Sequence, residues 1–324
     1  IGQEAMVRTL SNAIAGGRIA HAFILTGVRG VGKTTTARII ARALNCTGPD
    51  GKGGPTIEPC GVCDNCLRIA EDRHVDVLEM DAASRTGIGD IREIIDSVRY
   101  APASARYKIY IIDEVHMLST AAFNGLLKTL EEPPAHVKFI FATTEIRKVP
   151  VTVLSRCQRF DLRRVDAETL IAHLAMIAGK EQVTVEPEAL ALIARAAEGS
   201  VRDALSLLDQ AIAHGNGEVQ AAPVRDMLGL ADRVQVFDLF DQVMRGEIAA
   251  ALAALRRQYD AGVDPLLVLQ DMLELTHWLT RIKITPEAAD DVTVAEAERR
   301  RGREMAMALS MPVLYRAWEM LLKG

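Results

Sequence analysis

A glycine-rich segment near the start of the chain lies between a predicted strand and a predicted helix. The apolar run HAFILTG at 21–27 is typical of a buried strand, and residues 33–46 carry apolar side chains at helical spacing. Between them, GVRGVGKT matches the pattern G-x-x-x-x-G-K-[ST]. Such a turn aims backbone N–H groups at phosphate oxygens, at the positive end of the following helix. We therefore expect a phosphate loop, and an ordinary glycine-rich turn is the alternative.

The loop predicts a site for a nucleoside triphosphate with Mg²⁺. Lys33 supplies positive charge to the β and γ phosphates, and the hydroxyl of Thr34 reaches the Mg²⁺ ion. The expected nucleotide-binding residues are Gly27, Val28, Arg29, Gly30, Val31, Gly32, Lys33, Thr34 and Thr35.

Further strands predict an α/β domain around this loop. Apolar or alternating runs occur at 75–80, 108–114 and 137–144, and the segments 88–100 and 119–132 have helical patterns. Strands that alternate with helices predict a parallel sheet with both faces covered.

An acidic pair, Asp113 and Glu114, ends the apolar strand pattern IYIIDE. Ligands of open parallel sheets collect at the carboxyl ends of the strands. There Asp113 can hold the water shell of the metal, and Glu114 can orient or activate an attacking water. An acidic pair is also common as a helix N-cap, which is the alternative.

Four of the five cysteines fall within 21 positions, with the spacing C-x13-C-x2-C-x2-C. Four thiolates close the tetrahedral shell of Zn²⁺ and leave no position for water, so we expect a structural metal. It would tie the loop 48–59 to the end of the phosphate-loop helix. A disulfide pair and an iron–sulfur cluster are the alternatives. The expected zinc ligands are Cys46, Cys60, Cys63 and Cys66.

From about residue 166 we expect the strands to stop and helices to follow. The predicted domains are 1–165, with the cysteine module at 46–66, then 166–222 and 223–324, the last of them truncated. Residues 214–223 are expected to form a loop, and residues 285–298 an exposed connection. In the third domain we expect Val236, Phe240 and Val243 on one face of a helix.

The composition limits the class of protein. Of 324 residues, 49% are hydrophobic and 25% are charged, with no apolar run long enough to span a membrane and no signal-peptide pattern. We expect a soluble, non-secreted protein. The net charge of −5 argues against an overall electrostatic grip on nucleic acid. Because the chain begins at Ile1 within an amphipathic pattern, we interpret it as a fragment.

Two arginines, Arg156 and Arg202, are candidates to contact the γ-phosphoryl group. Arg156 lies in VLSRCQRF, after the strand that ends in Thr143 and Thr144, and Arg202 lies in GSVRDALSLLDQ. A guanidinium is permanently charged and suits the charge that develops on a γ-phosphoryl group. A surface salt bridge for Arg156 and an intrahelical pair for Arg202 are the alternatives.

Taken in order, GVRGVGKTT, CGVCDNC, YIIDEVHML, FATTE, VLSRC and GSVRDALSLLDQ resemble the gamma/tau subunits of bacterial DNA polymerase III clamp loaders. The resemblance covers essentially all of the chain. It implies an AAA+ ATPase core with an inserted zinc module, a helical lid domain and a helical collar domain that assembles subunits into a ring-like pentamer.

The resemblance also implies residue roles. Lys33 and Thr34 would bind phosphate and Mg²⁺, and Asp113 with Glu114 would form the Walker B pair. Thr144 matches the sensor 1 position. Arg156 would be an arginine finger that reaches the ATP site of the adjacent subunit, and Arg202 the sensor 2 arginine of its own subunit. Two basic residues match places near the DNA-facing interior, namely Arg85 and Lys128.

The function implied is ATP-driven opening and loading of the sliding clamp onto primer-template DNA during replication. The protein would be an ATP hydrolase within a DNA-directed DNA polymerase, a nucleotidyltransferase, in the cytoplasm. Expected cofactors are ATP, Mg²⁺ and Zn²⁺, and expected partners are delta, delta prime and further gamma/tau subunits, the clamp and DNA. No membrane is expected among them.

The sequence departs from the family in two places. Relative to the family, we expect this sequence to lack the segment before IGQE, which helps to enclose the adenine, and the tau extension, which would contact polymerase and helicase. Three other functions stay open: a non-hydrolysing stator subunit of the same loader, a branch-migration motor, and a zinc-dependent nucleic-acid adaptor with vestigial ATPase activity.

Overall fold

The computed structural model describes residues 1–215, 217–228, 233–287 and 296–323, and the chain divides into two compact units. The first unit contains residues 1–165 together with 200–202, and the second contains residues 166–199 and 203–324. None of the helices in the described ranges combines the length and the apolarity needed to cross a bilayer.

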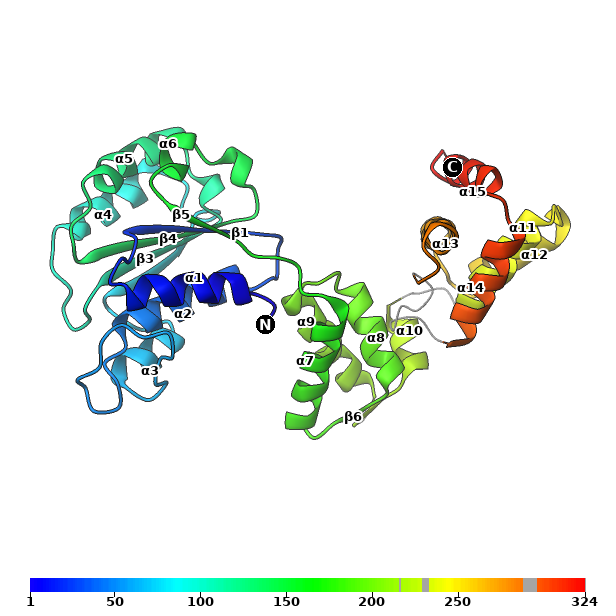
Figure 1. The fold of residues 1–324 in the computed structure, drawn as a ribbon, viewed down its shortest axis with the longest axis horizontal. Helices are drawn as coiled ribbons and strands as arrows, with labels where there is room; N and C mark the ends of the chain where they lie inside the picture. The colour runs from blue at the N-terminus through cyan, green and yellow to red at the C-terminus, as the bar shows by residue number, and fades with distance from the viewer. Residues whose placement is uncertain (216, 229–232, 288–295, 324) are drawn as a thin grey trace. The chain divides into compact units, whose positions relative to one another are not determined.

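A five-stranded parallel sheet forms the centre of the first unit (Figure 1). Its strand order is β2-β3-β4-β1-β5, and every neighbouring pair runs parallel. The strands are β1 (Ala22–Thr26), β2 (Val77–Asp81), β3 (Lys108–Asp113), β4 (Val137–Thr143) and β5 (Gln158–Asp161). The first four confirm the predicted strands, whereas β5 was not expected, because only Phe160 of its four residues is buried.

Helices cover both faces of the sheet, as predicted: α1 and α2 lie on one face, and α4, α5 and α6 on the other (Figure 1). The side chains of β3 alternate between the two cores, with Tyr110 and Ile112 packed toward α4 and α5, and Ile109 and Ile111 toward α2. The helices are α1 (Glu4–Ala15), α2 (Lys33–Asn45), α3 (Asp64–Ala70), α4 (Ile88–Val98), α5 (Thr120–Glu131) and α6 (Val151–Leu154), with 3₁₀ turns at Val115–Met117 and Ile146–Lys148.

The parallel arrangement positions the candidate site. Strands β1, β3 and β4 are neighbours, and the residues that follow them are the glycine-rich loop, Glu114 and Thr144. Because parallel strands end at the same edge of a sheet, three segments far apart in sequence meet there.

The first part of the second unit is mainly helical, with one departure from prediction. Two short strands, β6 (Thr184–Val185) and β7 (Glu218–Val219), form a parallel pair, so strands do not stop at residue 166. The expected loop at 214–223 contains β7 and the start of α10. Strands of two residues are too short to show an alternating pattern. The helices here are α7 (Ala167–Lys180), α8 (Pro187–Ala196), α9 (Val201–His214) and α10 (Ala221–Met227).

Five further helices share an apolar core at the carboxyl-terminal part of the chain. Val236 and Phe240 lie in this core as predicted, whereas Val243 is 44% exposed. Of the expected connection at 285–298, residues 288–295 lie outside the described residues, and α14 begins at Glu296. The helices are α11 (Arg233–Met244), α12 (Ile248–Asp260), α13 (Pro265–Ile284), α14 (Glu296–Ala308) and α15 (Met311–Leu321).

Candidate nucleotide-binding site and cysteine cluster

The glycine-rich loop joins β1 to α2, and two of its glycines are required by its backbone. Gly32, the N-cap of α2, is left-handed with φ 94°. Gly27 has φ 154°, and a Cβ there would lie 2.6 Å from the carbonyl oxygen of Leu162. A side chain at either position would strain or block the turn. The loop therefore leads into the N-terminus of α2, where backbone N–H groups are free to meet an anion.

Lys33, the first residue of α2, is buried with its ammonium turned back over the loop. Its Nζ donates to the carbonyl oxygens of Gly27 and Val28, at 3.1 Å each. Burial lowers the pKa of Lys33, and the carboxylates of Glu114 and Asp113 oppose that shift. A phosphate that entered the loop would offer this ammonium a negatively charged partner in place of neutral carbonyls.

Thr34 and Asp113 meet across the sheet edge. The hydroxyl Oγ1 of Thr34 donates to Oδ2 of Asp113 at 2.5 Å, while Oδ1 of Asp113 accepts the backbone N–H of Glu114 at 2.8 Å. A hydroxyl beside a carboxylate is a hard oxygen pair of the kind that Mg²⁺ prefers. These two residues fit the ion, which would neutralise charge on the phosphates.

Glu114 follows Asp113 in a left-handed backbone conformation, with φ 45° and ψ 44°. A non-glycine residue in this region carries strain, which is typical of functional sites. Its carboxylate oxygen Oε2 accepts from the backbone N–H and the hydroxyl of Thr144, at 3.1 and 2.9 Å. Although Glu114 is the N-cap of the following 3₁₀ turn, its side chain makes no capping bond.

His116 belongs to this cluster, and the sequence analysis did not single it out. Its Nδ1 lies 3.0 Å from Oγ1 of Thr143 and 3.3 Å from Oε2 of Glu114, and its side chain is only 6% exposed. The one signal in the sequence was a polar residue two positions after Glu114, which by itself does not indicate a contact.

Arg156 makes its hydrogen bonds away from this cluster. Its guanidinium donates to the carbonyl oxygen of Thr152 at 2.6 Å and to Oε1 of Glu131 at 2.7 Å. The pair with Glu131 is the surface salt bridge considered as the alternative, with the side chain of Arg156 32% exposed. Such a pair contributes about 0–1 kcal/mol, so a stronger anion could displace Glu131.

Arg202 lies in the first turn of α9, in the short segment that belongs to the first unit. Its backbone N–H donates to the carbonyl oxygen of Gly30 at 3.2 Å, and its charge contributes to the lowered pKa of Lys33, after the larger effect of burial. Positive charge near the loop favours a polyphosphate there.

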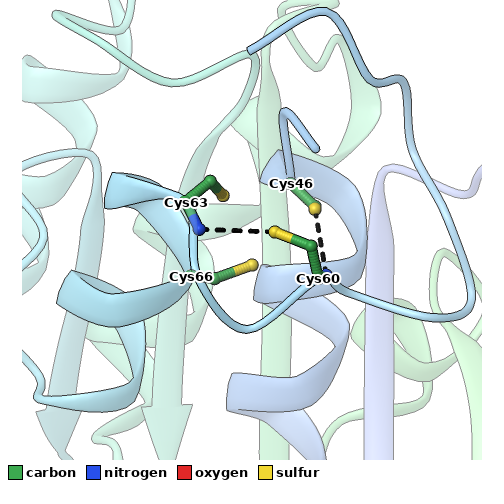
Figure 2. Close-up of side chains that lie close together, drawn as sticks. All are labelled: Cys46, Cys60, Cys63 and Cys66. Carbon is green, nitrogen blue, oxygen red and sulfur yellow. Dashed lines mark hydrogen bonds between the residues drawn. The ribbon is translucent and has the colours of Figure 1, made fainter. Parts of the chain in front are cut away.

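The four clustered cysteines lie together at the end of α2 and the start of α3 (Figure 2). Their sulfur atoms all lie within 4.8 Å of one another, and all five cysteines of the chain are free thiols. Tetrahedral Zn²⁺ with Zn–S bonds of about 2.3 Å requires sulfur separations of about 3.8 Å, so the arrangement fits zinc after small shifts. The fifth cysteine, Cys157, lies outside the group, and burial raises its pKa to about 12.

Backbone N–H groups point at the sulfur atoms. The N–H groups of Gly48 and Cys60 donate to Sγ of Cys46 at 3.4 Å each, and that of Cys63 to Sγ of Cys60 at 3.3 Å. Burial opposes ionisation of Cys63, but hydrogen bonds from the N–H groups of Thr47 and Cys66 outweigh it and lower its pKa to about 6. Thiolates stabilised in this way are suited to bind a divalent cation.

Polar contacts tie the cysteine module to the sheet. Arg106, which precedes β3, donates to the carbonyl oxygens of Leu44 and Gly53, at 2.7 and 2.8 Å. Asn65 of the module donates to the carbonyl oxygen of Asn45, the last residue of α2, at 2.8 Å. Sequence reasoning missed these residues, because their partners are distant along the chain. The module is therefore anchored to the sheet independently of a metal.

The two basic residues that match DNA-facing places in the family, Arg85 and Lys128, are both exposed. Arg85 lies in the turn after β2 and Lys128 on α5. Exposed cations of this kind are common, so their positions alone assign no contact.

Family comparisons cover almost the whole chain. Residues 2–166 match the family described as DNA polymerase III, delta subunit, and residues 169–217 match the DNA polymerase III clamp loader subunit, ATPase lid domain. Residues 219–324 match DNA polymerase III subunits gamma and tau domain III.

The relatives and solved structures agree with these matches. The chain is 45% identical to the DNA polymerase III subunit tau of Escherichia coli, over all of this chain and 49% of that protein, so it spans about half the length of that relative. It is 41% identical to the gamma subunit of Buchnera aphidicola, over 88% of this chain and 76% of that one. A Thermotoga maritima RuvB Holliday junction branch migration motor shares the fold alone, with a TM-score of 0.51 and 19% identity over 75% of this chain and 76% of that one. The chain has the AAA+ ATPase fold and belongs to the family of DNA polymerase III gamma and tau subunits.

Proposed function

We propose that the chain is an ATP-hydrolysing subunit of a DNA polymerase III clamp loader, which uses ATP to open the sliding clamp and load it onto primer-template DNA. The observation that carries the proposal is the meeting of Lys33, Thr34, Asp113, Glu114 and Thr144 at one edge of the parallel sheet. Family membership supports the choice of clamp loading among the uses of this fold.

Each residue has a distinct chemical task in this proposal. The backbone of 27–35 and the ammonium of Lys33 bind the phosphates, and Thr34 with Asp113 would hold Mg²⁺. Glu114 orients the attacking water, for which its carboxylate must turn from Thr144 toward the γ-phosphate. Thr144, released from Glu114, is then available to the γ-phosphate as sensor 1.

The two arginines complete the site in different ways. Arg156 enters the ATP site of an adjacent subunit, where a γ-phosphate has a higher negative charge than the carboxylate of Glu131 and competes for the guanidinium. Arg202 acts in its own subunit as sensor 2, which its position beside Gly30 supports. Hydrolysis by one subunit therefore depends on its neighbour.

The remaining assignments have structural roles. Zn²⁺ held by the four clustered cysteines closes the module 46–66, with no open position for catalysis. We propose domains at 1–165, 166–222 and 223–324, which the limits of the family matches support. Partners are the other loader subunits, the clamp and DNA, with Arg85 and Lys128 as candidate DNA contacts.

The direct test measures ATP turnover of the chain assembled with its partner subunits, with and without clamp and primed DNA. Wild type is mixed with an Arg156→Ala variant in varying ratio. We expect stimulation by clamp and DNA together, and a loss of about 10³-fold at sites next to the variant, because an arginine finger contributes that much to phosphoryl transfer. Nucleotide binding, measured with a fluorescent ATP analogue, should persist.

One negative result would contradict the proposed function, and another would contradict only the role of Arg156. Absence of nucleotide binding would contradict the proposal and favour the stator alternative. Full turnover in an assembly built only from Arg156→Ala subunits would show that Arg156 is not needed for hydrolysis, which would contradict its role as the arginine finger.

A further inference from the structure

His116 lies where two strands that contribute to the candidate site come together. It belongs to the 3₁₀ turn Val115–Met117 that follows β3, and its ring contacts the residues that end and follow β4. With 6% of its side chain exposed, it is almost entirely enclosed by protein. A buried imidazole needs polar partners, so the identity of those partners indicates what the ring does.

The Nδ1 edge of the ring faces two groups of the site. Oγ1 of Thr143 lies at 3.0 Å and Oε2 of Glu114 at 3.3 Å. The same oxygen of Thr143 accepts the backbone N–H of Glu145 at 3.0 Å, which orients that hydroxyl group. His116 therefore spans from the carboxylate of Glu114 to the end of β4, one residue before Thr144.

The Nε2 edge has a weaker contact. Oε1 of Glu145 lies 3.5 Å from Nε2, at the limit of a polar contact, and the same oxygen accepts from Nζ of Lys148 at 2.8 Å. The hydrogen bond from Lys148 is also the main cause that lowers the pKa of Glu145. At 3.5 Å the contact with Glu145 is longer than those on the other side, so the Nδ1 edge makes the closer contacts of the ring.

Glu114 needs such support, because its backbone is strained. A left-handed conformation at a non-glycine residue persists only where the surroundings hold it. Two donors from Thr144 hold its Oε2 in this structure. During ATP hydrolysis that carboxylate must exchange Thr144 for water, and the ring of His116 is the neighbour that can stay beside it through the exchange.

We infer that His116 is a positioning residue for ATP hydrolysis. The Nδ1 edge of its ring holds the carboxylate of Glu114 at a fixed position relative to the end of β4. The inference rests on the proposed function, since it assigns to His116 the alignment of the residue that orients the attacking water. His116 itself touches neither nucleotide nor metal in this role.

Two substitutions separate this role from simple packing. In His116→Asn the side-chain amide occupies the place of Nδ1, and in His116→Gln it reaches toward the place of Nε2. Asparagine therefore keeps the contacts with Glu114 and Thr143, whereas glutamine favours the contact with Glu145. Both variants place a neutral polar amide at this buried position, so the cost of burying it is similar in the two. A difference in kcat between them therefore reports which contact of the ring is needed.

The experiment measures kcat and KM for ATP in the assembled loader with clamp and primed DNA, together with affinity for a fluorescent ATP analogue. We expect kcat to fall about 10- to 100-fold in His116→Gln and His116→Ala, because a misplaced catalytic group costs that much. The His116→Asn variant should retain most of the wild-type kcat. KM and nucleotide affinity should stay near the wild-type values in all three variants, which also reports that the site is folded.

A matched control uses His136, a half-buried histidine directly before β4. Nε2 of His136 lies 3.2 Å from the carbonyl oxygen of Val98, at the start of β4 and away from the site. Asparagine and glutamine at His136 should both leave kcat within about twofold of wild type.

The outcomes distinguish the inference from the proposed function. Equal loss of kcat in the asparagine and glutamine variants, or a higher kcat in the glutamine variant, would overturn the inference. The proposed function would still stand if the wild-type loader hydrolysed ATP. Loss of nucleotide affinity in parallel with kcat would also overturn it. Absence of turnover in the wild-type loader would overturn both.

Discussion

Asp76 demonstrates at the scale of one residue how a buried carboxylate can hold a loop. It is 2% exposed, directly before β2, and accepts the backbone N–H groups of Ala103, Ser104 and Ala105 at 2.7 to 2.8 Å. Burial alone would raise the pKa of Asp76, but these hydrogen bonds outweigh burial and lower it. The segment that leads into β3 is thus fixed to the start of β2.

We predict that Asp76→Asn destabilises the first unit by about 3 kcal/mol at neutral pH, because charge-assisted hydrogen bonds are lost and an amide N–H₂ group faces the backbone donors. Since the folded pKa lies below the unfolded value, the stabilising contribution of Asp76 is fully present above about pH 4 and is lost as the pH falls through the folded pKa. Urea unfolding at several pH values measures both effects.

The control is an exposed aspartate. Asp161 pairs with Arg159 at the surface, so Asp161→Asn should change the free energy of unfolding by less than about 0.5 kcal/mol. Equal effects of the two substitutions would contradict the role given to Asp76.

At the scale of elements, the cysteine module is joined to the α/β unit by two helices. Cys46 follows the last residue of α2, and Cys63 precedes the first residue of α3. A metal bound by the cysteines would connect these two helix ends and close the loop 48–59. The sheet has apolar cores on both faces that are built from residues outside 46–66, so we expect it to remain folded without this connection.

We predict that the chain binds about one zinc ion, and that a chelator which removes it loosens the module without unfolding the sheet. Hydrogen exchange should become faster in residues 46–66 and stay slow in β1, β3 and β4. Metal content measured by mass spectrometry should fall in Cys60→Ser and stay unchanged in Cys157→Ser, since Cys157 lies outside the cluster. Loss of protection across the whole sheet would contradict this division.

At the scale of the whole molecule, several large apolar side chains of the carboxyl-terminal helices are exposed and do not pack in the core that these helices share. Met311 and Tyr315 of α15 and Leu322 at its C-cap recur at helical spacing, and Tyr315 and Leu322 are 68% and 62% exposed. A different side of α15 packs Leu314 into the core of these helices. An exposed apolar stripe of this kind favours contact with another protein chain.

We predict that Tyr315→Ser combined with Leu322→Ser weakens assembly with the other loader subunits by about tenfold or more, because two large apolar side chains would no longer be buried at the contact. Arg316→Gln, on the same helix, is the matched control and should leave assembly unchanged. Light scattering after gel filtration measures the mass of the assembly. Unchanged assembly of the double variant would place the subunit contact elsewhere.

Local patterns in the sequence were enough to predict most of the α/β unit. The glycine-rich loop, the strands that became β1 to β4 and the four clustered cysteines depend on residue spacing within short segments, which the sequence displays directly. Short strands such as β5 and the β6–β7 pair were not predicted, because four or two residues show no period. The catalytic roles of the site residues stay predictions.

The sequence by itself determined which groups the site could contain: a lysine in a phosphate loop, an acidic pair, a threonine after a strand, and a set of thiols. Only the tertiary structure decided which of them meet. The contacts of His116 with Thr143, of Arg106 with Leu44 and Gly53, and of Arg156 with Glu131 join residues that no local pattern predicts to be neighbours. The order of the strands and the packing of helices on the sheet set these contacts, because they bring together chain segments that no short-range periodicity relates.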